Sequence, residues 1–418
     1  MNAPNRPPLD RLPPDRLPPD RQPVDRLICH VMPQAFLMAL VAQGRLVELQ
    51  IARRDRPSLV DGIYLGRVER VMPELDAAFV DIGLGKSGFL RAADRAGIEE
   101  WPPLGAPVLV QVRAGNEDSD KGPRLTMNIA LSGRYLVYHP MGSGVSFSRR
   151  IEGESERDRL AGHVADLLEG GIVLRTAAAG ASREILEADA AQIMERWERV
   201  RRHALDAPPP ADITARVPGE RDPIARALRD HGAALEEVIL DDRTMARSLQ
   251  DEMDRCREKI RVRWHNGPMP VFDIDDVSGQ MDAALADRIA LASGVEILFE
   301  PGETLTAIDV DSGSAGGRQG RSPRRPVEVN LEAAPSIAQQ LRLRNLAGAV
   351  VIDFVSMRSA YDRDKVQAAL AEALRDDPVP TQLYGFTRLG LFELTRARRG
   401  APLAAQLEAL EQGGPLAD

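Results

Sequence analysis

Two aspartates, Asp309 and Asp353, stand in a sequence context that could support metal chemistry. Each directly follows apolar residues typical of a buried strand, LTAI before Asp309 and AVVI before Asp353. A carboxylate in such a place is costly to desolvate unless it is paired or coordinates a cation. If neighbouring strands bring the two acids together, their repulsion is roughly 4 kcal/mol at about 4 Å and an effective dielectric of about 20. A divalent cation would relieve that repulsion.

Oxygen ligands favour a hard cation, and two carboxylates with retained waters suit magnesium. Such an ion could activate a water molecule and stabilise the charge that develops on a scissile phosphate. Single acids at strand ends also cap helices or pair with arginines, so spacing alone leaves that interpretation open. The residue types therefore indicate a magnesium phosphodiesterase as one of two interpretations.

Two further groups of residues could bind nucleic acid. Phe79 and Phe89 lie in short segments with period-two alternation, and aromatic side chains on such strands can stack bases or simply fill a core. Arg175 and Thr176 follow an apolar run and precede a loop of small residues, where a guanidinium, a hydroxyl and backbone N–H groups could hold a phosphate.

The elements that would position these residues follow from periodicity and turn signals. Alternating runs separated by Pro and Gly turns predict a small closed barrel of the OB type, with strands at 63–72, 77–82, 88–91 and 107–113. The run 171–181 predicts a buried strand that ends in Arg175-Thr176 and a turn of small residues, followed by an amphipathic helix over 184–202. Further on, the patterns predict helices at 281–292 and 331–346 and strands at 295–300, 304–309 and 349–354.

Composition limits the broad class of the protein. With 418 residues, 43% of them apolar, the chain can build several domains. No apolar run is long enough for a membrane helix and no signal-peptide pattern is present, so we expect a cytoplasmic protein. Cys29 and Cys256 form no metal-binding or disulfide pattern, so we interpret both as packing residues. The net charge of −9 argues against nucleic acid, although arginines placed locally could still bind phosphate.

Six segments of the chain resemble the ribonuclease E/G family, in the family's order and at similar intervals. They are GRVERVMPELDAAFVDIGLGKSGFL, SRRIEG, LRTA, TLTAIDVDSG, NLEAAPSIAQQLRLRNLAG and VVIDF, and the similarity extends from about Leu27 to Arg399. The resemblance implies an α+β multidomain fold. Its expected parts are a Pro-rich disordered tail (1–26), an RNase H-like element (27–48 and 213–285), an OB-fold barrel (49–127), a 5′-phosphate sensor (128–212), a DNase I-like catalytic subdomain (286–400) and a C-terminal tail (401–418).

The resemblance also implies a function and its residues. Family members cut single-stranded, A/U-rich RNA in RNA processing and decay, using Mg²⁺ and leaving 5′-phosphate and 3′-hydroxyl ends. The implied site residues are the catalytic and metal-binding Asp309 and Asp353 with Asp311 beside them, the RNA-binding Phe79, Phe89 and Lys121, and the 5′-phosphate-binding Gly133, Val137, Arg175 and Thr176.

Three features depart from the family pattern. Asp311 stands where the family has an Asn, which adds a negative charge beside Asp309. The CPxC zinc-link motif is missing, so family precedent suggests a homodimer but no zinc-linked oligomer is expected. An Arg of the 5′ sensor is replaced near Pro380. These departures keep a second hypothesis open, a catalytically lapsed RNA-binding regulator. A magnesium phosphotransferase is disfavoured because no GxxxxGK[ST] phosphate loop is present.

Overall fold

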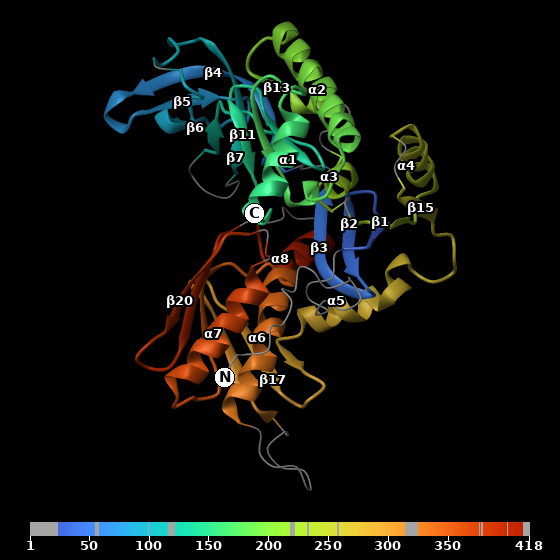
Figure 1. Ribbon diagram of the computed structural model, residues 1–418, viewed down its shortest axis with the longest axis vertical. Coiled ribbons are helices and arrows are strands. Elements are labelled where there is room, and N and C mark those ends of the chain that lie inside the picture. The colour runs from blue at the N-terminus through green and yellow to red at the C-terminus, as the bar shows by residue number, and fades with distance from the viewer. Residues whose placement is uncertain are drawn as a thin grey trace. The chain divides into compact units, whose positions relative to one another are not determined.

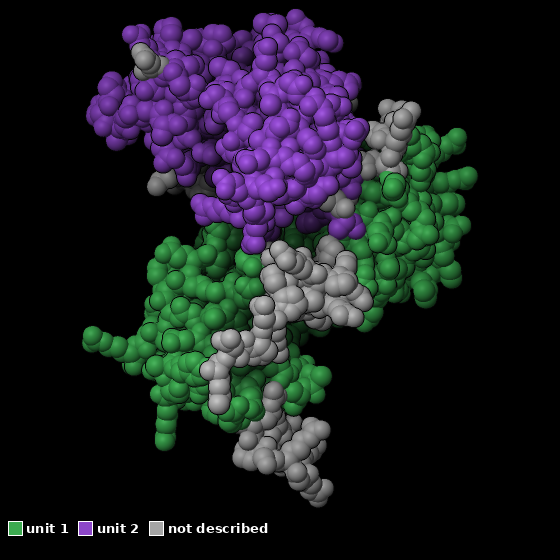
Figure 2. Space-filling model, in the orientation of Figure 1, with its two compact units in different colours: residues 1–51, 235–418 green, residues 52–234 purple. Residues whose placement is uncertain are grey.

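The computed structural model describes residues 24–54, 58–98, 100–115, 122–217, 222–231, 234–256, 259–313, 325–375, 377, 379–398 and 400–412. The chain is a mixed α and β protein that divides into two compact units, residues 1–51 with 235–418 and residues 52–234 (Figure 2). Within the described ranges, every helix is too short or too polar to cross a membrane. Lys121 and almost all of the Pro-rich tail lie outside the described residues.

The unit formed by residues 52–234 contains a closed five-stranded barrel of OB-like form. The strand order is β4-β5-β6-β8-β7, and β7 pairs back onto β4, so the ring closes. Its strands are β4 (Ile63–Met72), β5 (Ala77–Asp81), β6 (Gly88–Arg91), β7 (Pro107–Ala114) and β8 (Arg124–Thr126), and β13 (Ala211–Asp212) is added beside β4. The predicted barrel is therefore confirmed.

Alternation along each strand divides the barrel into an inner and an outer face. The buried interior includes Val68, Val80, Leu90 and Leu125. Glycine at position 88 makes space for this interior, since a Cβ there would lie 2.4 Å from the Leu125 side chain. The residues that alternate with the interior lie on the outer surface.

The same unit holds a second sheet, of order β11-β12-β10-β9. Its strands are β9 (Leu131–Ser132), β10 (Leu136–His139), β11 (Gly144–Phe147) and β12 (Gly171–Leu174), and its helices are α1 (Glu154–Val164), α2 (Arg183–Asp206) and α3 (Pro223–His231). The buried residues of α2, among them Leu186, Ile193 and Val200, recur at helical spacing and join the sheet residues in one core. The predicted strand before Arg175 and the predicted helix after it are both present.

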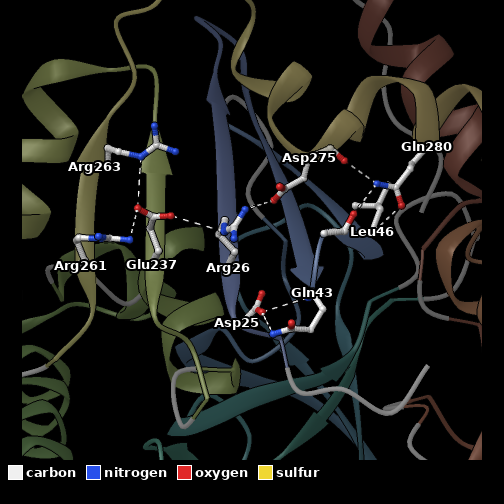
Figure 3. Close-up of polar contacts among 10 residues, drawn as sticks. Asp25, Arg26, Gln43, Leu46, Glu237, Arg261, Arg263, Asp275 and Gln280 are labelled. Carbon is white, nitrogen blue, oxygen red and sulfur yellow. Dashed lines mark hydrogen bonds and ion pairs between the residues drawn. The ribbon is translucent and has the colours of Figure 1, made fainter. Parts of the chain in front are cut away.

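The other unit begins with a sheet of order β15-β14-β1-β2-β3. Its strands are β1 (Arg26–Val31), β2 (Ala35–Ala42), β3 (Arg45–Arg53), β14 (Glu237–Leu240) and β15 (Arg261–Trp264), with helices α4 (Arg243–Cys256) and α5 (Val277–Leu285). Glu237 lies among three guanidinium groups, those of Arg26 at 3.6 Å, Arg261 at 3.0 Å and Arg263 at 3.4 Å (Figure 3). Arg26 also pairs with Asp275. This network joins β1, β14 and β15 to the segment before α5.

The last sheet has the order β16-β17-β18-β19-β21-β20 and carries the candidate acids. Its strands are β16 (Arg288–Ala290), β17 (Glu296–Pro301), β18 (Leu305–Asp311), β19 (Gly348–Asp353), β20 (Thr381–Phe386) and β21 (Phe392–Arg396), and its helices are α6 (Pro326–Leu343) and α7 (Ala360–Leu374). Helix α8 (Leu403–Glu411) instead packs, through Leu410, in the core of the sheet that contains β1, β2 and β3. Helices α6 and α7 lie side by side over one face (Figure 1). Ile308, Val310, Val350 and Ile352 are buried under them.

The path from α6 into β19 depends on two residues with left-handed backbone conformation. After α6 ends, Asn345 has φ 50° and Gly348 has φ 87°, a region that Gly adopts at low cost and Asn tolerates. The chain therefore reverses within a few residues and returns parallel to β18. Arg342 anchors the end of α6 to strand β3 through a 2.7 Å ion pair with Glu48.

Two sequence-based assignments differ from the structure. The helix predicted over 281–292 begins earlier, as α5, and ends at Leu285. Residues 288–290 instead form β16, because they pair with β17. The segment assigned to a C-terminal tail contains α8, whose Leu403 and Leu410 are buried.

Candidate active site

The acid pair lies on adjacent parallel strands. Asp309 of β18 is the direct register partner of Asp353, the last residue of β19. Residues paired in register point to the same face of a sheet, with strands about 4.8 Å apart. Because Ile308 and Ile352 are buried under the helices, the two carboxylates lie on the opposite, open face. The fold thus brings together the two acids that the sequence singled out.

Among the described residues, neither carboxylate of this pair makes a structural contact. Within the described part of the chain, Asp309 and Asp353 form no side-chain hydrogen bond and no ion pair with an arginine. The helix that follows Asp353 is instead capped by Ser359, whose Oγ accepts a hydrogen bond from the Asp362 backbone N–H at 3.4 Å. The alternative interpretation, in which the acids cap a helix or pair with an arginine, therefore lacks support in the described residues.

The electrostatic environment of Asp309 disfavours its ionised form. Partial burial raises the pKa of its carboxyl group, and the negative charges of Asp353 and Asp311 raise it further. Arg288 acts in the opposite direction. A raised pKa is the expected signature of carboxylates that repel one another without a cation between them.

Asp311 lies on the same open face as Asp309, two residues further along β18. Its Oδ1 accepts a hydrogen bond from the Gly313 backbone at 2.9 Å, and its register partner on β17 is Glu296. Glu296 in turn pairs with Arg288 at 2.8 Å. The carboxylate of Asp311 therefore adds negative charge near Asp309 while it holds the turn that leaves the strand.

The donor set fits a hard cation that keeps most of its water. Two carboxylates from adjacent strands suit Mg²⁺, which typically binds one or two protein carboxylates and retains several waters. In the part of the chain that the structure describes, no group of three or more Asp, Glu, His or Cys residues could hold an ion. Asp309 and Asp353 are the residues that would hold the ion.

One residue that the sequence analysis did not single out positions the end of β19. Asn330 of α6 is fully buried, and its side-chain amide exchanges two hydrogen bonds with the backbone of Val355, at 2.8 and 3.0 Å. This contact fixes the chain two residues beyond Asp353. The available signal was a polar residue on the apolar face of a predicted helix, since a buried amide needs partners.

The barrel aromatics lie on the outer face of neighbouring strands. Phe79 and Phe89 are register partners on β5 and β6, with ring centroids 5.6 Å apart and ring planes at 59°. Both are half-buried and neither belongs to the barrel core, whereas the next residues, Val80 and Leu90, are fully buried. The rings therefore form a half-buried pair on the outer face rather than part of the interior.

The residues of the expected phosphate sensor are partly brought together. The Arg175 guanidinium donates to the Gly133 carbonyl at 2.6 Å and forms an ion pair with Asp230 at 3.0 Å. The Thr176 hydroxyl lies 2.8 Å from that of Ser148. Val137 lies on β10, which pairs with β12, the strand that ends immediately before Arg175. Arg175 is thus already engaged by a carboxylate of α3.

Asp189 of α2, which the sequence analysis did not identify, shapes the loop of this sensor. Its side chain is 7% exposed and accepts hydrogen bonds from the backbone N–H groups of residues 134, 135 and 136, each at 2.9 Å. Burial raises the pKa of Asp189, and the three N–H groups oppose that rise. Only Gly fits at position 133, because a Cβ there would lie 2.6 Å from the Asp189 carboxylate.

Comparison with known proteins supplies independent information. The model of the Ribonuclease E/G family matches residues 130–399. The chain is 36% identical to Ribonuclease G of Salmonella typhimurium and 35% identical to Ribonuclease G of Haemophilus influenzae, in both cases over 394 residues, 89% of this chain and 79% of the relative. It is also 36% identical to Ribonuclease E of Nostoc sp. over 389 residues, which cover 88% of this chain and 55% of that protein.

Proposed function

Because this chain belongs to the ribonuclease E/G family, we propose that it is a magnesium-dependent endoribonuclease whose hydrolytic site is the acid pair on β18 and β19. The observation that best supports this proposal is the direct register pairing of Asp309 with Asp353 on an open face of the sheet. Endoribonuclease activity in RNA processing agrees with the names of the relatives. The requirement for magnesium and the preference for single-stranded, A/U-rich RNA are parts of the proposal.

In this proposal, Asp309 and Asp353 hold the ion through their carboxylate oxygens and set its place relative to the RNA backbone. When bound, magnesium supplies Lewis-acid stabilisation of the charge that develops on the scissile phosphate. The oxygen of a water molecule forms a bond to phosphorus while the bond from phosphorus to the 3′ oxygen breaks. The 3′ oxygen gains a proton as the attacking water loses one, which leaves a 5′-phosphate and a 3′-hydroxyl.

The chain's other predicted sites would present the substrate. Phe79 and Phe89 offer two ring faces on which unpaired bases can stack, and such stacking selects single strands because bases in a duplex are not accessible. Gly133, Arg175 and Thr176 would hold a 5′-monophosphate. Asp230 must release or share the Arg175 guanidinium for that contact, because it now forms an ion pair with it.

A cleavage assay with matched variants tests the proposal. A fluorescent A/U-rich single-stranded RNA is incubated with wild-type protein, Asp309→Asn and the control Asp364→Asn, with magnesium or with EDTA. Asp364 is exposed on α7, the helix over the opposite face of the sheet. We expect cleavage by wild type and control only with magnesium, and none by Asp309→Asn. Equal survival of the RNA with wild type and Asp309→Asn would refute the enzyme assignment.

A catalytically lapsed RNA-binding regulator is the second candidate. The observation in its favour is Asp311, because its charge raises the pKa of Asp309 and so disfavours the ionised carboxylate that an ion requires. The same assay separates the two functions when RNA binding is measured in parallel. A regulator would bind the oligonucleotide and leave it intact with magnesium present.

A further inference from the structure

A row of four side chains crosses the outer face of the barrel. In register, Arg70 of β4 pairs with Phe79 of β5, and Phe79 pairs with Phe89 of β6. Phe89 pairs in turn with Arg124 of β8. The row therefore reads cation, aromatic, aromatic, cation. It spans three strand spacings of about 4.8 Å each, or about 14 Å.

A bulge in β4 puts the first arginine into this row. The register shifts between Val68 and Arg70, so that Glu69 is the extra residue and Arg70 lies opposite Phe79. Without the bulge, Glu69 rather than Arg70 would lie opposite Phe79. The adjoining inner row, formed by Ala78, Leu90 and Leu125, is buried, which fixes the four side chains on the solvent side.

The charges at the two ends of the row are not neutralised. Among the residues that the structure describes, neither Arg70 nor Arg124 forms an ion pair with a carboxylate, and both side chains are exposed. The guanidinium carbon of Arg70 lies over the Phe79 ring, 4.8 Å from its centroid, so a base that stacks on that face of Phe79 must displace the guanidinium toward the phosphate. By contrast, Arg91 and Arg113 of the same barrel both pair with Asp94.

We propose that this row binds a short segment of single-stranded RNA that runs across the strands. Two neighbouring bases stack on Phe79 and Phe89, and the phosphates that flank them contact Arg70 and Arg124. In a single strand of RNA a phosphate lies on either side of two neighbouring bases, so a row with two aromatic rings at its centre and a cation at each end fits a dinucleotide and the phosphates that flank it. The proposal rests on the RNA-binding surface proposed above. It adds the two arginines and the path of the RNA across the β-strands.

Salt dependence of binding separates the charge contacts from stacking. Affinity for a fluorescein-labelled oligouridylate is measured in EDTA between about 50 and about 200 mM KCl. Each phosphate contact on a single strand contributes about 0.7 to the slope of log affinity against log salt. We expect Arg70→Gln and Arg124→Gln each to reduce the slope by about 0.7, and the double variant by about 1.4.

Three comparisons make the slope diagnostic. Arg70→Lys and Arg124→Lys keep the positive charge and should retain the wild-type slope, which also excludes a folding defect at either position. Phe79→Ala should weaken binding by about 5- to 150-fold with the slope unchanged. The control Arg201→Gln removes an exposed arginine of α2 that pairs with Glu198, and should change neither quantity.

The outcomes distinguish this inference from the proposed function. Wild-type slopes in both Gln variants would overturn the phosphate contacts of Arg70 and Arg124, even if Phe79→Ala bound RNA weakly. Base stacking on Phe79 and Phe89 would then remain supported. Wild-type affinity in folded Phe79→Ala would overturn both the proposed stacking on the aromatic pair and the proposed binding of RNA by the four-residue row. An abasic ribose-phosphate oligomer that bound as tightly as oligouridylate would show attraction by charge alone and would also overturn the stacked arrangement.

Discussion

Removal of the Asp309 carboxylate should stabilise the metal-free protein. Asp309 and Asp353 lie on strands about 4.8 Å apart. Two unit charges at that distance repel by about 0.9 kcal/mol at the dielectric of water and by about 3.5 kcal/mol at an effective dielectric of 20. Both side chains are exposed, so solvent screening places the value near the lower limit. We expect Asp309→Asn to gain about 1 kcal/mol in EDTA.

The sign of the pH dependence follows from the raised pKa of Asp309. At neutral pH the carboxylate is ionised and the wild-type protein is destabilised by the repulsion. As the pH falls through the pKa of Asp309, protonation removes the charge and the wild type recovers that stability. The advantage of Asp309→Asn should therefore be present at neutral pH and disappear in acid.

Magnesium should reverse the order of the two proteins. An ion that binds only the folded wild type stabilises it by about 2.7 kcal/mol at about a hundredfold excess over its Kd. The variant lacks one of the two ligands and should gain much less. The midpoint of thermal unfolding, followed by circular dichroism, should rise by about 2 to 4 °C for each kcal/mol in a unit of this size. A less stable Asp309→Asn in EDTA at neutral pH, or equal stabilisation of both proteins by magnesium, would refute the reasoning.

Three further perturbations test other parts of the chain. Asp311→Asn removes a charge that raises the pKa of Asp309, so the acid limb of the profile of cleavage rate against pH should move to lower pH. An unchanged acid limb would contradict an effect of Asp311 on the pKa of Asp309. Arg175→Ala should reduce any preference for 5′-monophosphate over 5′-hydroxyl RNA in parallel cleavage assays, and a preference that survives places the sensor elsewhere. Asp377→Ala leaves Arg396, 2% exposed, without its carboxylate and should cost about 3 to 5 kcal/mol in urea unfolding; a loss below about 1 kcal/mol would show that the backbone carbonyl near Arg396 suffices.

The sequence predicts the local elements of the candidate site well because apolar periodicity determines them. The run before Asp309, the helix after it and the run before Asp353 together form a strand, helix, strand unit. A short crossover of this kind commonly joins parallel neighbouring strands. The carboxylates, each at the same step beyond its apolar run, then fall in register. This part of the site was predictable from one sequence.

Other contacts depend on register and tertiary packing, which periodicity does not encode. Asp189 and Asn330 look like ordinary polar residues of helices until the fold brings backbone groups to them from distant segments. Arg70 enters the barrel row only because Glu69 is bulged, and a shift of one residue would place it on the other face. Residues 288–290 were assigned to a helix because local preference cannot reveal a pairing partner such as β17.

The negative net charge of the chain and its proposed RNA substrate are compatible once individual arginines are considered. Many arginines of the described residues are matched locally, such as Arg183 by Asp166 and Arg201 by Glu198, and contribute little to a surface potential. Phosphate is attracted by guanidinium groups that lack such partners, and the barrel row ends in two of them. If the two arginines of the row supply the main phosphate contacts, and stacking supplies the rest of the affinity, the salt dependence of binding should be shallow. The formal charge of −9 therefore does not decide whether RNA binds, and the salt dependence reports the number of phosphate contacts instead.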